Sequence, residues 1–308
     1  MIVGSTARLQ SVQCCPLCGD DERTPIAGDA AIVRCSSCET VYVAERLSRE
    51  VLDDCCDETV ADPPTPAEHF RMHATLRRYD RLAGGRLVRA FPGFRALDIG
   101  CGNGAMLDVL RDLGYATEGI ERAEPRARQA ARRHRIHAVD PCNAGVDLGG
   151  RYELILLSHA LDHMPRPVAA LQFVARHLAP GGVVVVEVAN WNDLAPRTAK
   201  LASSRRLGEH AVFYEGKTLR HALEGAGLQV RACTGEVSSR AVEPRTAATS
   251  ATDRRDSEES GRVSTYVRRL ARGLLDRLDP WLEGALAKPR PPAPDIVAVA
   301  VHDPAELH

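Results

Sequence analysis

The chain has 308 residues, with 40 Lys and Arg against 41 Asp and Glu, so its formal charge is -1 at pH 7. That balance excludes the basic field by which a protein holds a polyanion through bulk electrostatics, although a local patch could still do so. Hydrophobic residues make up 44% and charged residues 26%, which is typical of a globular protein. No apolar run approaches the roughly 18 residues of a membrane-spanning helix. The N-terminus shows no secretory signal, so we expect a cytoplasmic protein.

Four of the ten cysteines form two Cys-x2-Cys knuckles that are separated by sixteen residues. They are Cys15, Cys18, Cys35 and Cys38. A two-residue gap lets one tight turn direct both thiolates at the same ion, and four thiolates make a closed tetrahedral site, most simply for structural Zn²⁺. Strand-like residues at 31–34 and 41–43 flank the second knuckle, so we predict a zinc ribbon over residues 1–45. The alternatives are free thiols or a site that has lost its metal. Cys14 could replace Cys15, but only Cys15 begins the CPLCG turn.

The middle of the chain alternates between strand and helix patterns. Residues 46–68 are acidic and rich in proline, which predicts a linker, and residues 69–91 predict helices broken near Gly84. Strands are then predicted at 95–99, 116–121, 136–139, 154–157, 183–188 and 228–233. Helices are predicted at 105–113, from 122 to about 135, at 167–178 and at 218–224. This alternation indicates an α/β protein with a parallel sheet buried on both faces.

The C-terminal part breaks the alternation. Residues 236–262 lack any core signal and predict a flexible insertion. Residues 263–290 form an amphipathic helical insertion, whose apolar stripe within 263–287 could lie on a membrane surface, as a peripheral contact. We favour packing of this stripe on its own domain or on the partner in a homodimer. The tail, residues 291–308, contains a seventh strand at 295–302.

Residues 96–104 read ALDIGCGNG, where the first predicted strand meets the first helix. The glycines permit a tight turn and let backbone N–H groups approach a ligand. This turn alone is a weak signal, because nicotinamide and flavin enzymes use a similar one. Three acids at strand ends make this indication of a nucleotide-like ligand site more specific. Asp98 could meet an ammonium group, Glu121 both hydroxyls of a ribose, and Asp140 an adenine amino group.

These segments resemble the class I S-adenosylmethionine-dependent methyltransferases, over about residues 70–235 and the final strand. The glycine-rich turn resembles the first motif of that family, and the resemblance extends to GIE at 119–121, SHALDHMPRP at 158–167 and LAPGGVVVVEV at 178–188. It implies a Rossmann-like, seven-stranded, mostly parallel sheet, with the last strand antiparallel between strands five and six. The ribbon and the later strings NWNDL and GEHAVFYEGKTLRHALEGAGL resemble a subgroup frequent in bacterial glycan and natural-product pathways.

The resemblance also implies that residues 69–235 are the S-adenosylmethionine-binding core. The donor-binding residues it implies are Asp98, Gly100, Cys101, Gly102, Gly104, Glu121, Asp140 and Ser158. For each acid, the alternative is a strand-end cap or a loop carboxylate.

Methyl transfer is an in-line displacement at an activated sulfonium, so the protein mainly aligns donor and acceptor and removes a proton where the acceptor requires it. His210, in a loop beyond the fifth strand, is the first candidate for a general base, and His159 is the second. Each could instead be a hydrogen-bonded packing histidine. Asp162 with His159 and His163 could also be a divalent-metal site.

The sequence thus predicts methyl transfer to a small-molecule or glycan acceptor, at a hydroxyl oxygen. One alternative is an RNA methyltransferase whose ribbon binds RNA, which an arginine cluster at 126–135 would favour. Carbon or nitrogen methylation of a natural product is another, and a donor-binding scaffold without activity is a third. The near-zero net charge makes nucleic acid the less favoured partner.

Overall fold

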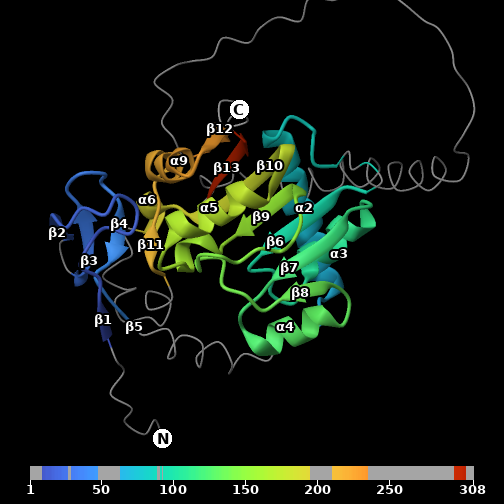
Figure 1. Cartoon of the computed structure of the whole chain (residues 1–308), viewed down its shortest axis with the longest axis horizontal. Coiled ribbons are helices and arrows are strands. Elements are labelled where there is room, and N and C mark those ends of the chain that lie inside the picture. The colour runs from blue at the N-terminus through green and yellow to red at the C-terminus, as the bar shows by residue number, and fades with distance from the viewer. Residues whose placement is uncertain are drawn as a thin grey trace, which may run out of the picture. The chain divides into compact units, whose positions relative to one another are not determined.

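The computed structural model describes residues 9–26, 29–47, 63–88, 91, 93–194, 210–234 and 295–302 (Figure 1). The predicted insertions at 236–262 and 263–290, and most of the predicted linker, lie outside these residues. Among the residues described, no helix combines the length and apolarity needed to cross a bilayer.

A seven-stranded sheet forms the centre of the fold (Figure 1). In chain order its strands are β6 (Arg95–Ile99), β7 (Ala116–Ile120), β8 (Arg135–His137), β9 (Tyr152–Ser158), β10 (Leu178–Ala189), β12 (Leu228–Cys233) and β13 (Asp295–His302). Their spatial order is β12-β13-β10-β9-β6-β7-β8. The five strands from β10 to β8 are parallel, whereas β13 is antiparallel to both β10 and β12. The predicted sheet is confirmed, including the antiparallel last strand between the fifth and the sixth.

Both faces of this sheet are buried, which explains the continuous apolar runs in its central strands. One face packs against α2 (Pro66–Leu82) and α3 (Ala105–Asp112), which contribute Leu76 and Val109 to its hydrophobic cluster. The other face packs against α5 (Pro167–His177) and α9 (Gly216–Gly225), through Phe173 and Leu219. The helix α4 (Glu124–Ala131) lies beside β8, at the edge (Figure 1).

Several boundaries differ from the predictions, and three of these differences have a clear description. The helix α2 begins at Pro66, inside the predicted linker, because Thr65 and Glu68 form a capping box across its first turn. The strand β10 begins at Leu178, and an irregularity in its pairing with β9 accommodates Gly181 at φ 74°. The strand β8 ends at His137, two residues earlier than predicted.

The N-terminal region contributes a second, four-stranded sheet. It contains β2 (Arg23–Ile26), β3 (Asp29–Cys35) and β4 (Val41–Val43). A short strand β11 (Val212–Phe213), which lies between β10 and β12 in the chain, completes this sheet in the order β11-β4-β3-β2. A separate pair joins β1 (Leu9–Ser11) to β5 (Glu45–Leu47). The sequence did not predict β11, because two residues carry no periodicity.

Candidate active site and metal centre

The glycine-rich turn follows β6 at the carboxyl edge of the sheet. Neighbouring residues pack closely against one side of this turn, which explains why it contains glycines. Gly100 and Gly104 have φ angles of 79° and 85°. A Cβ on Gly100 would lie 2.8 Å from that of Ala160, and one on Gly104 would lie 3.2 Å from the side chain of Arg133. A Cβ on Gly102 would meet no atom within 4 Å. The turn is therefore packed on one side and open at Gly102, as a ligand cradle requires.

Two buried carboxylates lie at this turn. Asp98 is only 4% exposed, and burial, together with the charge of Glu121, raises its pKa to about 7. The Oε2 of Glu121 accepts a hydrogen bond from the Gly102 N–H at 2.8 Å, and its Oε1 accepts one from the Ala123 N–H at 2.8 Å. A pair of buried acids favours a ligand that brings positive charge or hydroxyl donors. An ammonium group and a ribose meet both needs, so these residues fit S-adenosylmethionine.

The other predicted donor residues have local roles that the sequence did not indicate. The Cys101 side chain is buried in a cluster with Leu107 and Ala130, so this residue has only its backbone to offer a ligand. Asp140 lies three residues beyond β8, and its Oδ1 accepts a hydrogen bond from the Cys142 N–H at 3.0 Å. Ser158 ends β9 and donates from its Oγ to Oε2 of Glu187, at 3.0 Å.

Glu187 is the main residue that the sequence analysis missed. It is 3% exposed in β10, and both Arg78 and Tyr79 of α2 donate to its carboxylate. Burial raises the pKa of Tyr79 to about 12, so this hydroxyl stays a donor. The strand predicted at 183–188 carries this one carboxylate among its valines. A lone acid near the end of such a strand was the available signal.

His159 lies beside this carboxylate. Its backbone is in the left-handed region, at φ 49°, and its N–H donates to the carbonyl of Glu187 at 2.8 Å. Its Nε2 is 3.8 Å from Oε2 of Glu187 and 3.9 Å from Oδ2 of Asp295. Backbone strain of this kind is typical of functional sites, where surrounding contacts hold it in place.

His210 forms an ion pair with a second buried acid. Its Nε2 lies 3.2 Å from Oδ2 of Asp162, which is 2% exposed and belongs to the short 3-10 helix η1 (Leu161–His163). Burial alone would raise the pKa of Asp162, but the contact with His210 and the charges of nearby histidines outweigh it and lower that pKa. The contact between Nε2 of His210 and Oδ2 of Asp162 does not have the geometry of a good hydrogen bond. Among the described residues, neither carboxylate oxygen of Asp162 has a hydrogen-bond partner.

The structure changes the set of residues in the possible divalent-metal site, for which the sequence suggested Asp162, His159 and His163. The possible ligand atoms of Asp162, His163 and His210 lie within 4.8 Å of one another. His159 instead groups with Glu187 and Asp295. His210 thus takes the place that the sequence assigned to His159.

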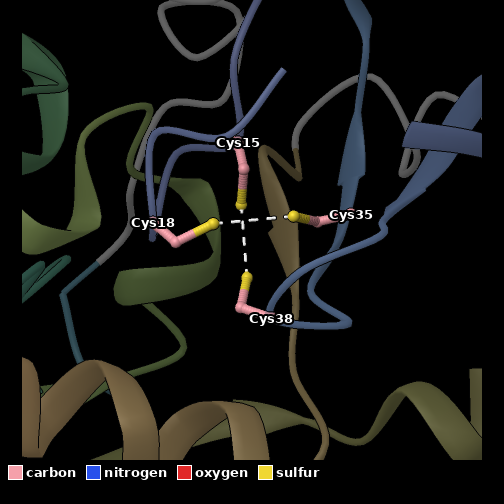
Figure 2. A group of neighbouring side chains, drawn as sticks. All are labelled: Cys15, Cys18, Cys35 and Cys38. Atoms are coloured by element: carbon pink, nitrogen blue, oxygen red, sulfur yellow. Dashed lines mark hydrogen bonds between the residues drawn. The ribbon is translucent and has the colours of Figure 1, made fainter. Parts of the chain in front are cut away.

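The four knuckle cysteines lie together in the N-terminal region, and Figure 2 shows their sulfur atoms directed at a common centre. The Sγ atoms of Cys15 and Cys38 are 3.5 Å apart, as are those of Cys18 and Cys35. A tetrahedral zinc with bonds of about 2.3 Å holds its sulfurs about 3.8 Å apart, so this set fits the ion. Cys14 is exposed and is not one of the four.

This sheet order, with a glycine-rich turn and two acids at the carboxyl edge, defines a Rossmann-like fold of the methyltransferase class. The methyltransferase-domain family profile matches residues 67–232, which is more than half of the chain. The chain therefore belongs to this methyltransferase-domain family.

Among similar proteins is a ubiquinone biosynthesis O-methyltransferase from Caulobacter sp. (strain K31), which is 27% identical over 158 residues. That match covers 47% of this chain and 57% of the relative. The corresponding enzyme of Caulobacter vibrioides is 28% identical with the same coverage, so the chain spans little more than half the length of these relatives.

Two solved structures are also similar to parts of this chain, each with a TM-score below 0.5. A methyltransferase from Archaeoglobus fulgidus matches with a TM-score of 0.47 and 20% identity, over 75% of this chain and 93% of that one. The amino pentose methyltransferase CalS10 from Micromonospora echinaspora is 29% identical, with a TM-score of 0.33, over 39% of this chain and 50% of that one.

Proposed function

We propose that this enzyme methylates a hydroxyl oxygen of a small-molecule or glycan acceptor. The observation that carries the proposal is the contact of 3.2 Å between Nε2 of His210 and Oδ2 of the buried Asp162, since a carboxylate beside an imidazole suits a histidine that accepts a proton. The similarity to ubiquinone biosynthesis O-methyltransferases supports oxygen as the acceptor atom.

S-adenosylmethionine supplies an electrophilic sulfonium methyl group when it is bound. In our proposal Asp98 binds the ammonium group of the donor and Glu121 the ribose hydroxyls. The open backbone at Gly102 would let the donor approach, and Asp140 and Ser158 would complete the site. These contacts orient the donor and exclude water from it.

On the acceptor side, His210 would remove the hydroxyl proton at Nδ1, while Asp162, which faces Nε2, stabilises the imidazolium that forms. The depressed pKa of Asp162 supports this role, because the carboxylate stays ionised throughout the neutral range. His159 is the second candidate, with Glu187 as its carboxylate neighbour.

Cys15, Cys18, Cys35 and Cys38 would hold one structural zinc ion. Four thiolates leave no open coordination position, so the ion would stabilise the ribbon and take no part in methyl transfer. Elemental analysis of the purified protein, with Cys35→Ser as the comparison, tests this part.

The RNA alternative loses support from the arginine cluster. Arg128 forms an ion pair with Glu124 at 2.6 Å, and Arg133 one with the partly buried Asp108 at 3.3 Å. Paired arginines of this kind present less positive charge to a phosphate backbone.

The proposal is tested by a transfer assay with radiolabelled S-adenosylmethionine on phenols, glycosides and RNA, followed by variants on the acceptor that responds. His210→Gln should lower kcat about 100-fold or more, the usual contribution of a general base, without changing donor affinity. His159→Gln is the matched comparison and should have the smaller effect. Labelled RNA or a methylated nitrogen would overturn the proposed acceptor, and full turnover by His210→Gln would remove that residue as the base.

A further inference from the structure

The strand β11 belongs to the sheet of the ribbon, although in the chain it lies between β10 and β12 of the large sheet. Val212 pairs with Tyr42 and Phe213 with Val41, antiparallel, at the open edge of β4. The Val43 N–H also donates to the carbonyl of Ala211, at 3.2 Å. The ribbon therefore holds the three residues that directly follow His210.

The same segment is tied to the methyltransferase domain on its other side. The Ala211 N–H donates to the Asp162 carbonyl at 2.7 Å, and the Trp191 N–H donates to the carbonyl of Tyr214 at 2.8 Å. Residues 210–214 thus form a bridge between β4 of the ribbon and the segments that follow β9 and β10.

Side chains reinforce this bridge. Phe213 is buried in a small cluster with Ile32, Val41 and Val43 of the ribbon and Trp191 of α6 (Trp191–Leu194). The His210 ring stacks on Phe213, with centroids 5.5 Å apart and an interplanar angle of 13°. The ring that faces Asp162 therefore rests on a residue whose position depends on the ribbon.

Charged residues beside the second knuckle anchor the following helix. Arg34, next to Cys35, contacts Glu215 at 3.1 Å, and Glu39, next to Cys38, pairs with Lys217. The knuckle also sets the start of β4, because the Cys35 N–H donates to the Thr40 carbonyl at 2.9 Å. The cysteine site is thus connected to β4, and β4 in turn pairs with β11.

We propose that the ribbon is a positioning element for the acceptor side of the active site: β4 holds β11, and Phe213 on β11 holds His210 against Asp162. This inference rests on the proposed role of His210. The donor residues Asp98 and Glu121 lie at the ends of β6 and β7, which do not pair with the ribbon. Loss of the ribbon's order should therefore disturb the acceptor side and spare the donor side.

The test combines hydrogen exchange with calorimetry on the full-length, zinc-loaded protein. Removal of zinc by a chelator should reduce the exchange protection of the peptide over 211–217 about tenfold or more, the response expected when local order is lost. Peptides from β6 and β9 should stay unexchanged over the time in which the peptide over 211–217 exchanges, and the affinity for S-adenosylhomocysteine should stay within about twofold, a change of less than 1 kcal/mol.

A variant that retains the metal separates positioning from metal loss. Phe213→Ala should keep zinc and product affinity but lose protection at 211–217, and Phe213→Leu should restore most of it. Ile26→Ala is the matched control, because Ile26 packs on the same cluster from β2, away from β11. Unchanged protection at 211–217 in both the chelated protein and Phe213→Ala would overturn the inference. A protein that does not bind S-adenosylhomocysteine at all would instead overturn the proposed function.

Discussion

At the scale of single residues, Asp98 combines a functional position with a cost in stability. Its pKa of about 7 lies above the ordinary value of 3.8 for an aspartate, so the folded chain binds a proton here that the unfolded chain has released. Stability contributed by this site therefore falls as the pH rises from about 4 to about 7, and the full penalty stays above that range.

From this we predict opposite effects of Asp98→Asn on stability and on binding. At pH 8 without donor the variant should melt several degrees higher, because an amide carries no buried charge, whereas at pH 5 the difference should be smaller, because only part of the penalty has developed there. Its affinity for the donor should fall about tenfold or more, since a hydrogen bond to a charged group is lost. Scanning calorimetry at both pH values and titration with S-adenosylhomocysteine measure these effects.

The control for Asp98 is Asp112→Asn, which changes a half-exposed carboxylate at the end of α3, 3.3 Å from Nε2 of His69. Exposed pairs of this kind contribute little to stability, so the variant should melt within about a degree of the parent and keep its donor affinity. A donor affinity of Asp98→Asn equal to that of the parent would contradict the assignment of this residue to the ammonium group.

At the scale of elements, the sequence predicted whatever depends on local pattern. The bounds of β12 and β13 match the predicted strands at 228–233 and 295–302, because apolar periodicity and turn residues mark both. The contacts of Glu187 with α2, and of Asp162 with His210, join segments that are far apart in the chain. No local pattern specifies such pairs, so the sequence could name His210 but not its partner.

The turn that follows α4 also supports the glycine-rich donor turn. It does so through Arg133, which belongs to the arginine cluster at 126–135. The Nη2 of Arg133 donates to the Asn103 carbonyl at 2.6 Å, inside the glycine-rich turn, and the same guanidinium pairs with Asp108. We predict that Arg133→Gln weakens donor binding about tenfold, because a charge-assisted hydrogen bond contributes about 1.5–3 kcal/mol. Titration calorimetry with S-adenosylhomocysteine measures the change.

Arg132→Gln provides the comparison for Arg133→Gln. Arg132 is the exposed neighbour of Arg133, and its substitution removes the same charge. If both variants bind the donor alike, Arg133 has no special role at the turn. If both instead lose binding to RNA in a filter assay, the arginine cluster is a nucleic-acid surface after all.

At the scale of the whole molecule, the ribbon and the large sheet share one hydrophobic cluster. Tyr42 and Val33 of the ribbon belong to the same set of buried residues as Tyr214, and as Phe173 and Leu219 over the sheet. The ribbon therefore contributes to the core, and each large side chain buried there contributes about 1.5–3 kcal/mol. The metal that orders the ribbon should then influence the stability of the entire fold.

We predict that zinc removal lowers the melting temperature of the methyltransferase domain itself by about 5 °C or more, a loss of about 2 kcal/mol in a domain of this size. The reason is that a ribbon without metal no longer holds Tyr42 and Val33 against the shared cluster. Calorimetry of the zinc-loaded protein should give one transition, and added zinc should restore its temperature after chelation. Cys35→Ser should reproduce the chelated state, whereas Cys14→Ser, which changes an exposed thiol outside the set of four, should not. Two separate transitions, with the upper one insensitive to zinc, would show that the ribbon melts as an independent appendage.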